Sequence, residues 1–135
     1  MTSPVRSAAG SRAAGLLVVL IVAKILSVVG RDPAGGIWLL PALFWQDVAV
    51  AALFWAIDRL LRRSRLMWIP YGVIVAYAAV NVPIARALSS PLTVPMWRAA
   101  RGPLLDSIAI YLTPVNLALI LTVIAVGAIA PNLTG

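Results

Sequence analysis

Two charged side chains lie inside long apolar stretches of this 135-residue chain, where an ionised group is energetically unfavourable unless it is paired. Asp47, beside Gln46, lies near the middle of one stretch, and Lys24 interrupts another. A lone carboxylate in a lipid-embedded segment costs roughly 3 kcal/mol or more, so it must face protein, pair with a cation or bind a proton. Lys24 is the obvious partner for Asp47, and the two form a candidate intramembrane polar pair.

The predicted depths of these two residues differ by about 8 Å at a rise of about 1.5 Å per residue, and a lysine stem can close most of that gap. The pair has two interpretations. It is either a structural clamp between helices or a relay for protons or ions. We favour the clamp, because a relay normally needs more than one titratable pair.

Most other site chemistry is excluded by composition. The chain has no cysteine, no histidine and no glutamate, and only four aspartates. Thiolate catalysis, disulfides and cysteine metal sites are therefore excluded, and the materials for most hydrolytic centres are absent. We predict no catalytic, cofactor-binding or metal-binding residue, and we do not expect these 135 residues to be an enzyme by themselves.

Composition also indicates whether the surface of the chain faces water or lipid. Hydrophobic residues make up 62% of the chain and charged residues 11%, too few to cover a water-soluble domain. The apolar residues form four blocks of about the length needed to cross a bilayer, and they are apolar all round rather than alternating. We therefore predict an all-α, polytopic membrane protein with four transmembrane helices, at about 13–29, 37–56, 67–84 and 104–130.

Arginine placement predicts the orientation. Six arginines fall on the side of the amino-terminal tail 1–12 and the loop 57–66, against four on the opposite side. Positive residues favour the cytoplasmic side, so we expect the amino terminus there, in a bacterial inner membrane. The six are Arg6, Arg12, Arg59, Arg62, Arg63 and Arg65, and the four are Arg31, Arg86, Arg98 and Arg101.

The net charge of +7 does not indicate nucleic acid, because the basic residues flank the predicted spans and have no interleaved aromatic platform. Anionic lipid headgroups are the better partner. We expect the lipid bilayer to be the main partner of this chain.

The loop 85–103 is predicted to be an extracytoplasmic elbow with a short interfacial helix before the fourth span. Trp97 would lie at headgroup level, with Arg98 and Arg101 reaching to the interface. Asp106 lies near the amino-terminal end of the fourth span and favours its macrodipole. An alternative is that these four residues contact another domain.

Prolines accompany polar residues at two places in the spans. Asn81 precedes Pro83 in the third span, and Thr113 and Asn116 flank Pro114 in the fourth. We expect helix breaks there, with freed carbonyls satisfied by amide side chains between helices. A substrate pocket is the alternative.

Two segments carry a resemblance to a known family. They are NVPIARALSSPLTVPMWRAARGPLLDSIAIYLTPVNL at 81–117 and DVAVAALFWAIDRLLRR at 47–63. Both resemble the membrane region that precedes the catalytic domain in bacterial membrane-anchored sulfatase-like proteins. This group of the alkaline phosphatase superfamily includes lipoteichoic acid synthase-like phosphoglycerol transferases. The resemblance implies five spans, a cytoplasmic amino terminus and an extracytoplasmic metal-dependent hydrolase or transferase domain.

That catalytic domain, with its divalent metal ligands and nucleophile, is absent from the sequence. The segment from Thr93 to Arg98 only faintly matches the sulfatase nucleophile pattern, so no catalytic residue is transferred. After Asp106 the remaining 29 positions carry no charge, and we expect the end at 132–135 to be a truncation. The chain is then a membrane anchor. The alternative is a free-standing small membrane protein, either an accessory subunit of a larger complex or a small oligomeric transporter using Lys24 and Asp47.

Overall fold

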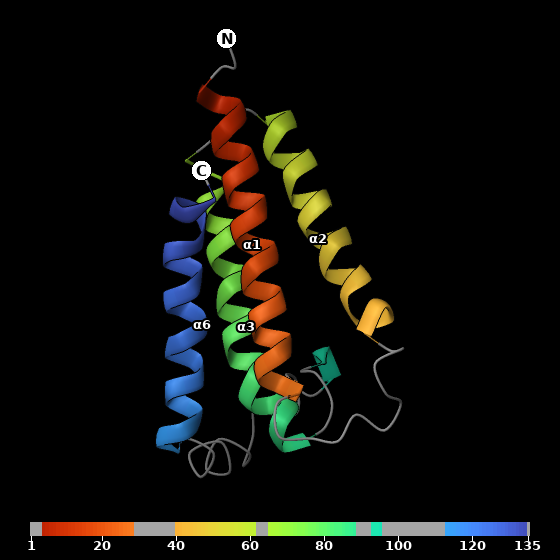
Figure 1. Cartoon of the computed structure of the whole chain (residues 1–135), viewed down its shortest axis with the longest axis vertical. Helices are drawn as coiled ribbons and strands as arrows, with labels where there is room; N and C mark the ends of the chain where they lie inside the picture. The colour runs from red at the N-terminus through yellow and green to blue at the C-terminus, as the bar shows by residue number, and fades with distance from the viewer. Residues whose placement is uncertain (1–3, 29–39, 62–64, 89–92, 96–112, 135) are drawn as a thin grey trace.

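The computed structural model describes residues 4–28, 40–61, 65–88, 93–95 and 113–134. This part of the chain is helical and contains four long helices (Figure 1). They are α1 (Pro4–Val28), α2 (Leu40–Leu61), α3 (Trp68–Leu88) and α6 (Pro114–Leu133). The all-α prediction is confirmed for the described residues, whereas most of the predicted elbow at 85–103 lies outside them.

Helix α1 is the centre of the arrangement. It packs against α2, α3 and α6, and α3 also packs against α6. The helices alternate in direction along the chain, so α1 begins and α6 ends at the same end of the bundle (Figure 1). We call this end, which also holds the carboxyl end of α2 and the beginning of α3, the Arg12 end, and the opposite end the Lys24 end.

Three helical segments are long and apolar enough to cross a membrane: Gly10–Val28, Trp68–Ala87 and Pro114–Leu133. Their lengths of 19 to 20 residues match the thickness of the hydrocarbon core. The structure thus supports a membrane protein. Helix α2 has 22 residues and carries Asp47, Asp58 and Arg59 among apolar neighbours.

The helix ends differ from the predicted ones. Helix α1 begins at Pro4, so residues 4–12, expected in a tail, belong to the helix. A proline is well tolerated there, because the first helical N–H groups have no partner within the helix. Helix α2 continues to Leu61 instead of ending at residue 56. The apolar runs predict where the helices lie, but the helices also include polar and charged residues beyond the ends of these runs.

The two expected helix breaks have different outcomes, because only the one at Asn81 and Pro83 is contradicted. Helix α3 runs through Asn81 and Pro83 to Leu88 without interruption. Helix α6 begins at Pro114, and the Thr113 side chain accepts a hydrogen bond from the Asn116 backbone N–H at 3.2 Å. Thr113 is therefore an N-cap and Pro114 the first helical residue, a common pairing at helix starts.

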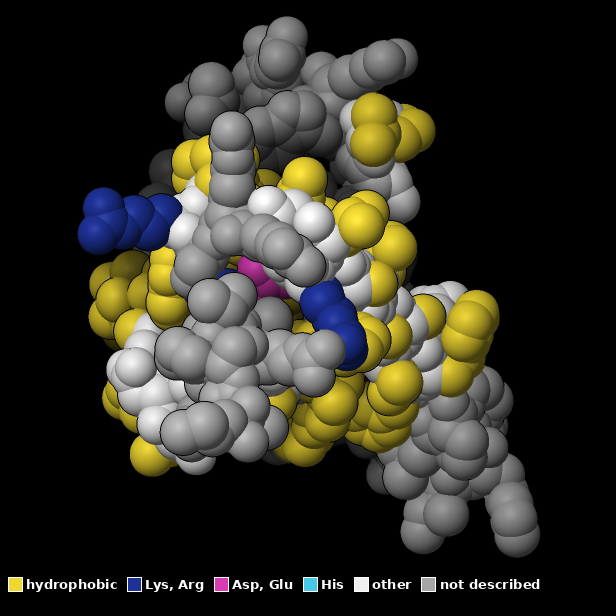
Figure 2. Space-filling model, turned by 90° about the horizontal axis from the view of Figure 1, so that it is seen from above, with side chains coloured by type: hydrophobic (Ala, Val, Ile, Leu, Met, Phe, Trp, Pro, Cys, Tyr) yellow, Lys and Arg dark blue, Asp and Glu magenta, His cyan; other side chains and the backbone are white. Residues whose placement is uncertain are grey.

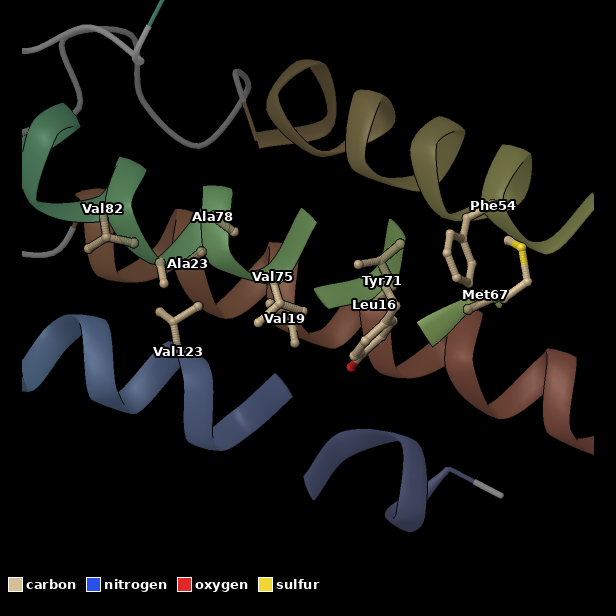
Figure 3. Packing of buried hydrophobic residues seen from close by; sticks show 12 residues of the cluster. Leu16, Val19, Ala23, Phe54, Met67, Tyr71, Val75, Ala78, Val82 and Val123 are labelled. Carbon is tan, nitrogen blue, oxygen red and sulfur yellow. The ribbon is translucent and has the colours of Figure 1, made fainter. Parts of the chain in front are cut away.

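The core is narrow and closely packed (Figure 3). Leu16 and Val19 of α1, Val82 of α3 and Val123 of α6 are completely or almost completely buried. Glycine allows α6 to approach its neighbours: a Cβ added at Gly127 would lie 2.6 Å from the Val75 Cγ1. Small residues at such contacts are typical of helices packed in lipid, where close van der Waals contact drives association.

Candidate functional site

The inward face of α2 carries two aspartates. Asp47, Ala51, Phe54 and Asp58 are all buried, and their spacing of four, three and four residues places them on one stripe of the helix. The rest of the helix surface exposes large apolar side chains, among them Trp45, Val48, Leu53, Trp55 and Leu60. Helix α2 therefore turns its aspartates toward the protein interior and its apolar side chains outward. This distribution is the reverse of that on a water-soluble helix.

The first aspartate pairs with Lys24, the partner expected from the sequence. Lys24 Nζ lies 2.5 Å from Asp47 Oδ2, which joins α1 to α2 near the Lys24 end. The Lys24 and Asp47 side chains keep 24% and 13% of their surface exposed, and Lys24 Nζ also lies 5.5 Å from the centre of the Phe44 ring. The pair is neutral as a unit, which lowers the cost of placing it within an apolar bundle.

The second aspartate pairs with Arg12, a contact that was not predicted from the sequence. Arg12 Nε donates to Asp58 Oδ2 at 2.9 Å, and Arg12 Nη2 donates to Asp58 Oδ1 at 3.0 Å. The two side chains are only 4% and 1% exposed, and the Arg12 guanidinium lies 5.9 Å from the centre of the Trp68 ring. Two parallel charge-assisted bonds of this kind are stronger than a single contact.

Arg12 is therefore a buried helix residue and not part of a flexible tail, because α1 extends beyond it to Pro4. A signal for its partner was present in the sequence. Asp58 lies eleven residues after Asp47, close to three helical turns, so both carboxylates share one face of α2. A second carboxylate on a buried face requires a second cation.

The two ion pairs fix the axial register of α1 against α2. The helices are antiparallel (Figure 1), and the cations lie twelve residues apart on α1 while the aspartates lie eleven apart on α2. At about 1.5 Å per residue these separations are roughly 18 and 16 Å, so both pairs form in the same register. A slip by one turn would separate both cations of α1 from the aspartates of α2.

Hydrogen bonds and ring contacts link the other helices at the Arg12 end. The Tyr71 hydroxyl of α3 donates to the Gly127 carbonyl of α6 at 2.7 Å. The Tyr71 ring contacts Trp68 and Phe54 edge-on, with centroids 5.4 and 6.2 Å apart. Thr134 Oγ1, just after α6, lies 2.8 Å from the Ser11 carbonyl of α1. All four helices are thus joined at this end.

One further arginine acts at the Lys24 end. Arg86 Nη1 of α3 donates to the Leu26 carbonyl of α1 at 2.8 Å. The last carbonyls of a helix have no partner within it, and a cation there also favours the helix dipole. Arg86 therefore satisfies and stabilises the carboxyl end of α1.

Three other predicted site residues belong to the part of the chain that the structure describes. Asn81 is half-buried within α3, and Thr113 and Asn116 cap the start of α6. The predicted interfacial contacts, Trp97, Arg98, Arg101 and Asp106, lie outside the described residues.

The described residues contain no group of three or more acidic, histidine or cysteine side chains able to hold a metal ion. They also leave no buried side-chain nitrogen or oxygen without a hydrogen-bond partner. What its polar groups can do is hold four helices in one arrangement.

Comparison with known proteins gives no match for this chain among protein-family models, curated proteins or solved structures.

Proposed function

We propose that this chain is a membrane-anchoring and positioning domain in which α1, α2, α3 and α6 all cross the bilayer, with a short interfacial helix before α6. The observation that carries this proposal is the reversed polarity of α2, whose two aspartates face α1 while leucine, valine and tryptophan side chains face outward. Lipid is the solvent that suits such a surface.

The proposed orientation has a cytoplasmic amino terminus in a bacterial inner membrane. Its support is the cluster of four arginines between positions 59 and 65, which begins in the last turn of α2 and ends before α3. Clustered arginines close to membrane ends favour the cytoplasmic side. The Lys24 end then lies toward the outer face.

Topology can be tested by labelling single cysteines, since the natural chain has none. In intact cells, a membrane-impermeant maleimide should label Gly36→Cys and Ser90→Cys but not Ser64→Cys. Labelling of Gly36→Cys and Ser64→Cys from the same side would mean that α2 does not cross the membrane. The opposite pattern at all three positions would reverse the orientation.

We further propose that the anchored partner is an extracytoplasmic sulfatase-like hydrolase or phosphoglycerol transferase domain, which would hold the catalytic groups and any divalent metal. The resemblance of 47–63 and 81–117 supports this assignment. Two ion pairs that fix the register of α1 and α2 give the bundle the rigidity that a positioning domain needs. Trp97, Arg98, Arg101 and Asp106 would form its outer-face contact.

The mass of the native product tests the anchor. An epitope tag at the amino terminus, read in the native membranes, should give a band of several tens of kDa. A band near 14.3 kDa would overturn the anchor proposal. In the full-length protein, replacing Trp97 and Arg98 with alanine should lower activity without affecting membrane insertion, and unchanged activity would remove the contact role.

A second candidate is favoured by the partial exposure of the Lys24–Asp47 pair. In a free-standing protein this pair would serve a small oligomeric transporter as its titratable site, and without transport the chain would be an accessory subunit of a larger complex. Asp47→Asn should abolish transport if the pair carries a proton or an ion. Normal transport by this variant would eliminate the relay.

A further inference from the structure

An apolar groove of about 440 Å³ lies between α2 and α3 toward the Arg12 end. Its walls are side chains of the carboxyl half of α2 and the beginning of α3, and all ten are apolar. They are Val50, Leu53, Phe54, Ile57, Leu61, Leu66, Met67, Ile69, Pro70 and Ile74. The volume is within the range of ligand pockets, about 300 to 1,000 Å³, but no polar group in the wall would orient a polar ligand.

The dimensions of the groove match one leaflet of a bilayer. On α2 it extends from Val50 to Leu61, roughly 16 Å along the helix axis. Half of a hydrocarbon core about 30 Å thick is about 15 Å. An acyl chain that enters beside Leu61 and Leu66 would therefore end near the membrane centre, beside Val50 and Ile74.

An exposed positive side chain lies next to the groove wall in the sequence. Arg65 is exposed and directly precedes Leu66 of the groove wall. The nearest aspartate in the sequence, Asp58, is buried and paired with Arg12, so it does not compensate the charge of the turn. Figure 2, which looks onto this end, shows dark blue side chains on the outside of the molecule and a magenta patch near its centre.

We propose that the groove between α2 and α3 binds one acyl chain of an anionic phospholipid, whose phosphate lies at Arg65. The apolar wall selects the hydrocarbon chain, and the arginine selects the charge of the headgroup. Basic residues beside membrane helices attract anionic lipids in this way. The site lies at the end opposite to the proposed outer-face contact, so it is not a substrate site for an outer enzyme domain.

The test uses the full chain in nanodiscs of equal parts phosphatidylglycerol and phosphatidylcholine with identical acyl chains. After transfer to a mild detergent, native mass spectrometry counts the lipids that stay bound. We expect phosphatidylglycerol to be retained about fivefold over phosphatidylcholine, the factor that one arginine at an anionic surface supplies. Equal retention of the two lipids by the natural chain would overturn the proposal.

Matched variants locate the site. Arg65→Gln should abolish the preference and Arg65→Lys should keep it. Arg59→Gln removes the same charge from the other side of α2, where the Arg59 guanidinium lies 5.2 Å from the centre of the Trp55 ring, and should leave the preference unchanged. Equal loss in Arg59→Gln and Arg65→Gln would mean general attraction and would overturn a defined headgroup position.

A second pair of variants tests the acyl chain. Ile57→Trp places a ring into the groove and should reduce retention of both lipids, whereas Leu117→Trp on the exposed surface of α6 should not. Unchanged retention in Ile57→Trp would contradict acyl binding. The site rests on the proposed insertion of α2. Failure of the cysteine labelling would remove both proposals, whereas failed lipid retention with α2 inserted would remove only this one.

Discussion

The two ends of the bundle use the same kind of contact, a cation of α1 with an aspartate of α2, in different surroundings. At the Arg12 end two hydrogen bonds join Arg12 to Asp58, and the side chains are 4% and 1% exposed. At the Lys24 end one short contact joins Lys24 to Asp47, and about a quarter of the lysine side chain remains exposed.

Because of this difference, we call the Arg12 end the fixed end and the Lys24 end the adaptable end, with respect to the geometry of the ion pair. A planar guanidinium that binds both carboxylate oxygens holds one geometry, whereas an ammonium on a flexible stem can keep its charge satisfied in several. Aromatic rings and the Tyr71 hydroxyl add further contacts at the Arg12 end. We therefore expect the stability of the fold to depend mainly on the Arg12 end, and changes of side-chain geometry to be tolerated better at the Lys24 end.

The largest effect should come from breaking the pair at the Arg12 end. Arg12→Met leaves the Asp58 carboxylate buried without its cation, and Asp58→Leu removes the carboxylate that compensates the buried Arg12 charge. Each should destabilise the bundle by about 3 to 5 kcal/mol, the usual cost of half a buried ion pair. Reversible unfolding in mixed micelles measures the change.

The double variant Arg12→Met/Asp58→Leu is the control for this prediction. Replacing both charges with apolar side chains removes the uncompensated charge, so most of the lost stability should return. If the double variant is as unstable as the single ones, the pair acts through its shape and its contact with Trp68 rather than through charge compensation.

Close packing beside the same pair gives a smaller expected effect. A Cβ added at Gly15 would lie 2.9 Å from the Pro131 backbone nitrogen, an atom that cannot move alone. Gly15→Ala should therefore push α6 away from α1 and cost about 1 to 3 kcal/mol. Gly10→Ala is the matched control, because its Cβ would meet nothing within 4 Å and alanine favours the helix. Equal stability of the two variants would contradict close packing at this end.

Sequence reasoning identified the Lys24–Asp47 contact because both residues interrupt apolar runs. An isolated charge in lipid is energetically costly, so a partner of opposite charge can be predicted for it. It also located all four helices, since apolar runs about 20 residues long have few alternatives in a membrane. The spanning of the bilayer by α2 and the orientation stay predictions, because neither follows from the arrangement of the helices alone.

The Arg12–Asp58 pair was not predicted, because an arginine before an apolar run is normally counted as a topological signal. Whether such a residue lies in a tail or in a helix depends on where the helix begins, and the apolar pattern does not determine that position. Asn81 with Pro83 illustrates the same difficulty: the motif suggests a break, yet neighbouring helices in a packed bundle allow a proline within a continuous helix.

Breaking the ion pair at the Lys24 end should cause a smaller loss of stability. Lys24→Met removes the cation from Asp47, but the Asp47 side chain keeps 13% of its surface exposed, so water can solvate the carboxylate. The cost should be about 1 to 2 kcal/mol, clearly below that of Arg12→Met measured in the same micelles. Losses of equal size at both ends would contradict the distinction between a fixed and an adaptable end.

The smallest expected effect comes from a single hydroxyl at the Arg12 end. Tyr71→Phe keeps the ring contacts with Phe54 and Trp68 but removes the hydrogen bond to the Gly127 carbonyl, which joins α3 to α6. The loss should be about 1 kcal/mol, the net value of one such bond. Tyr77→Phe removes a hydroxyl from a ring that is 49% exposed on the same helix, and it should cost less. If Tyr71→Phe costs no more than this control, the ion pair and the close glycine contacts account for the fixed end, and the hydroxyl adds nothing to them.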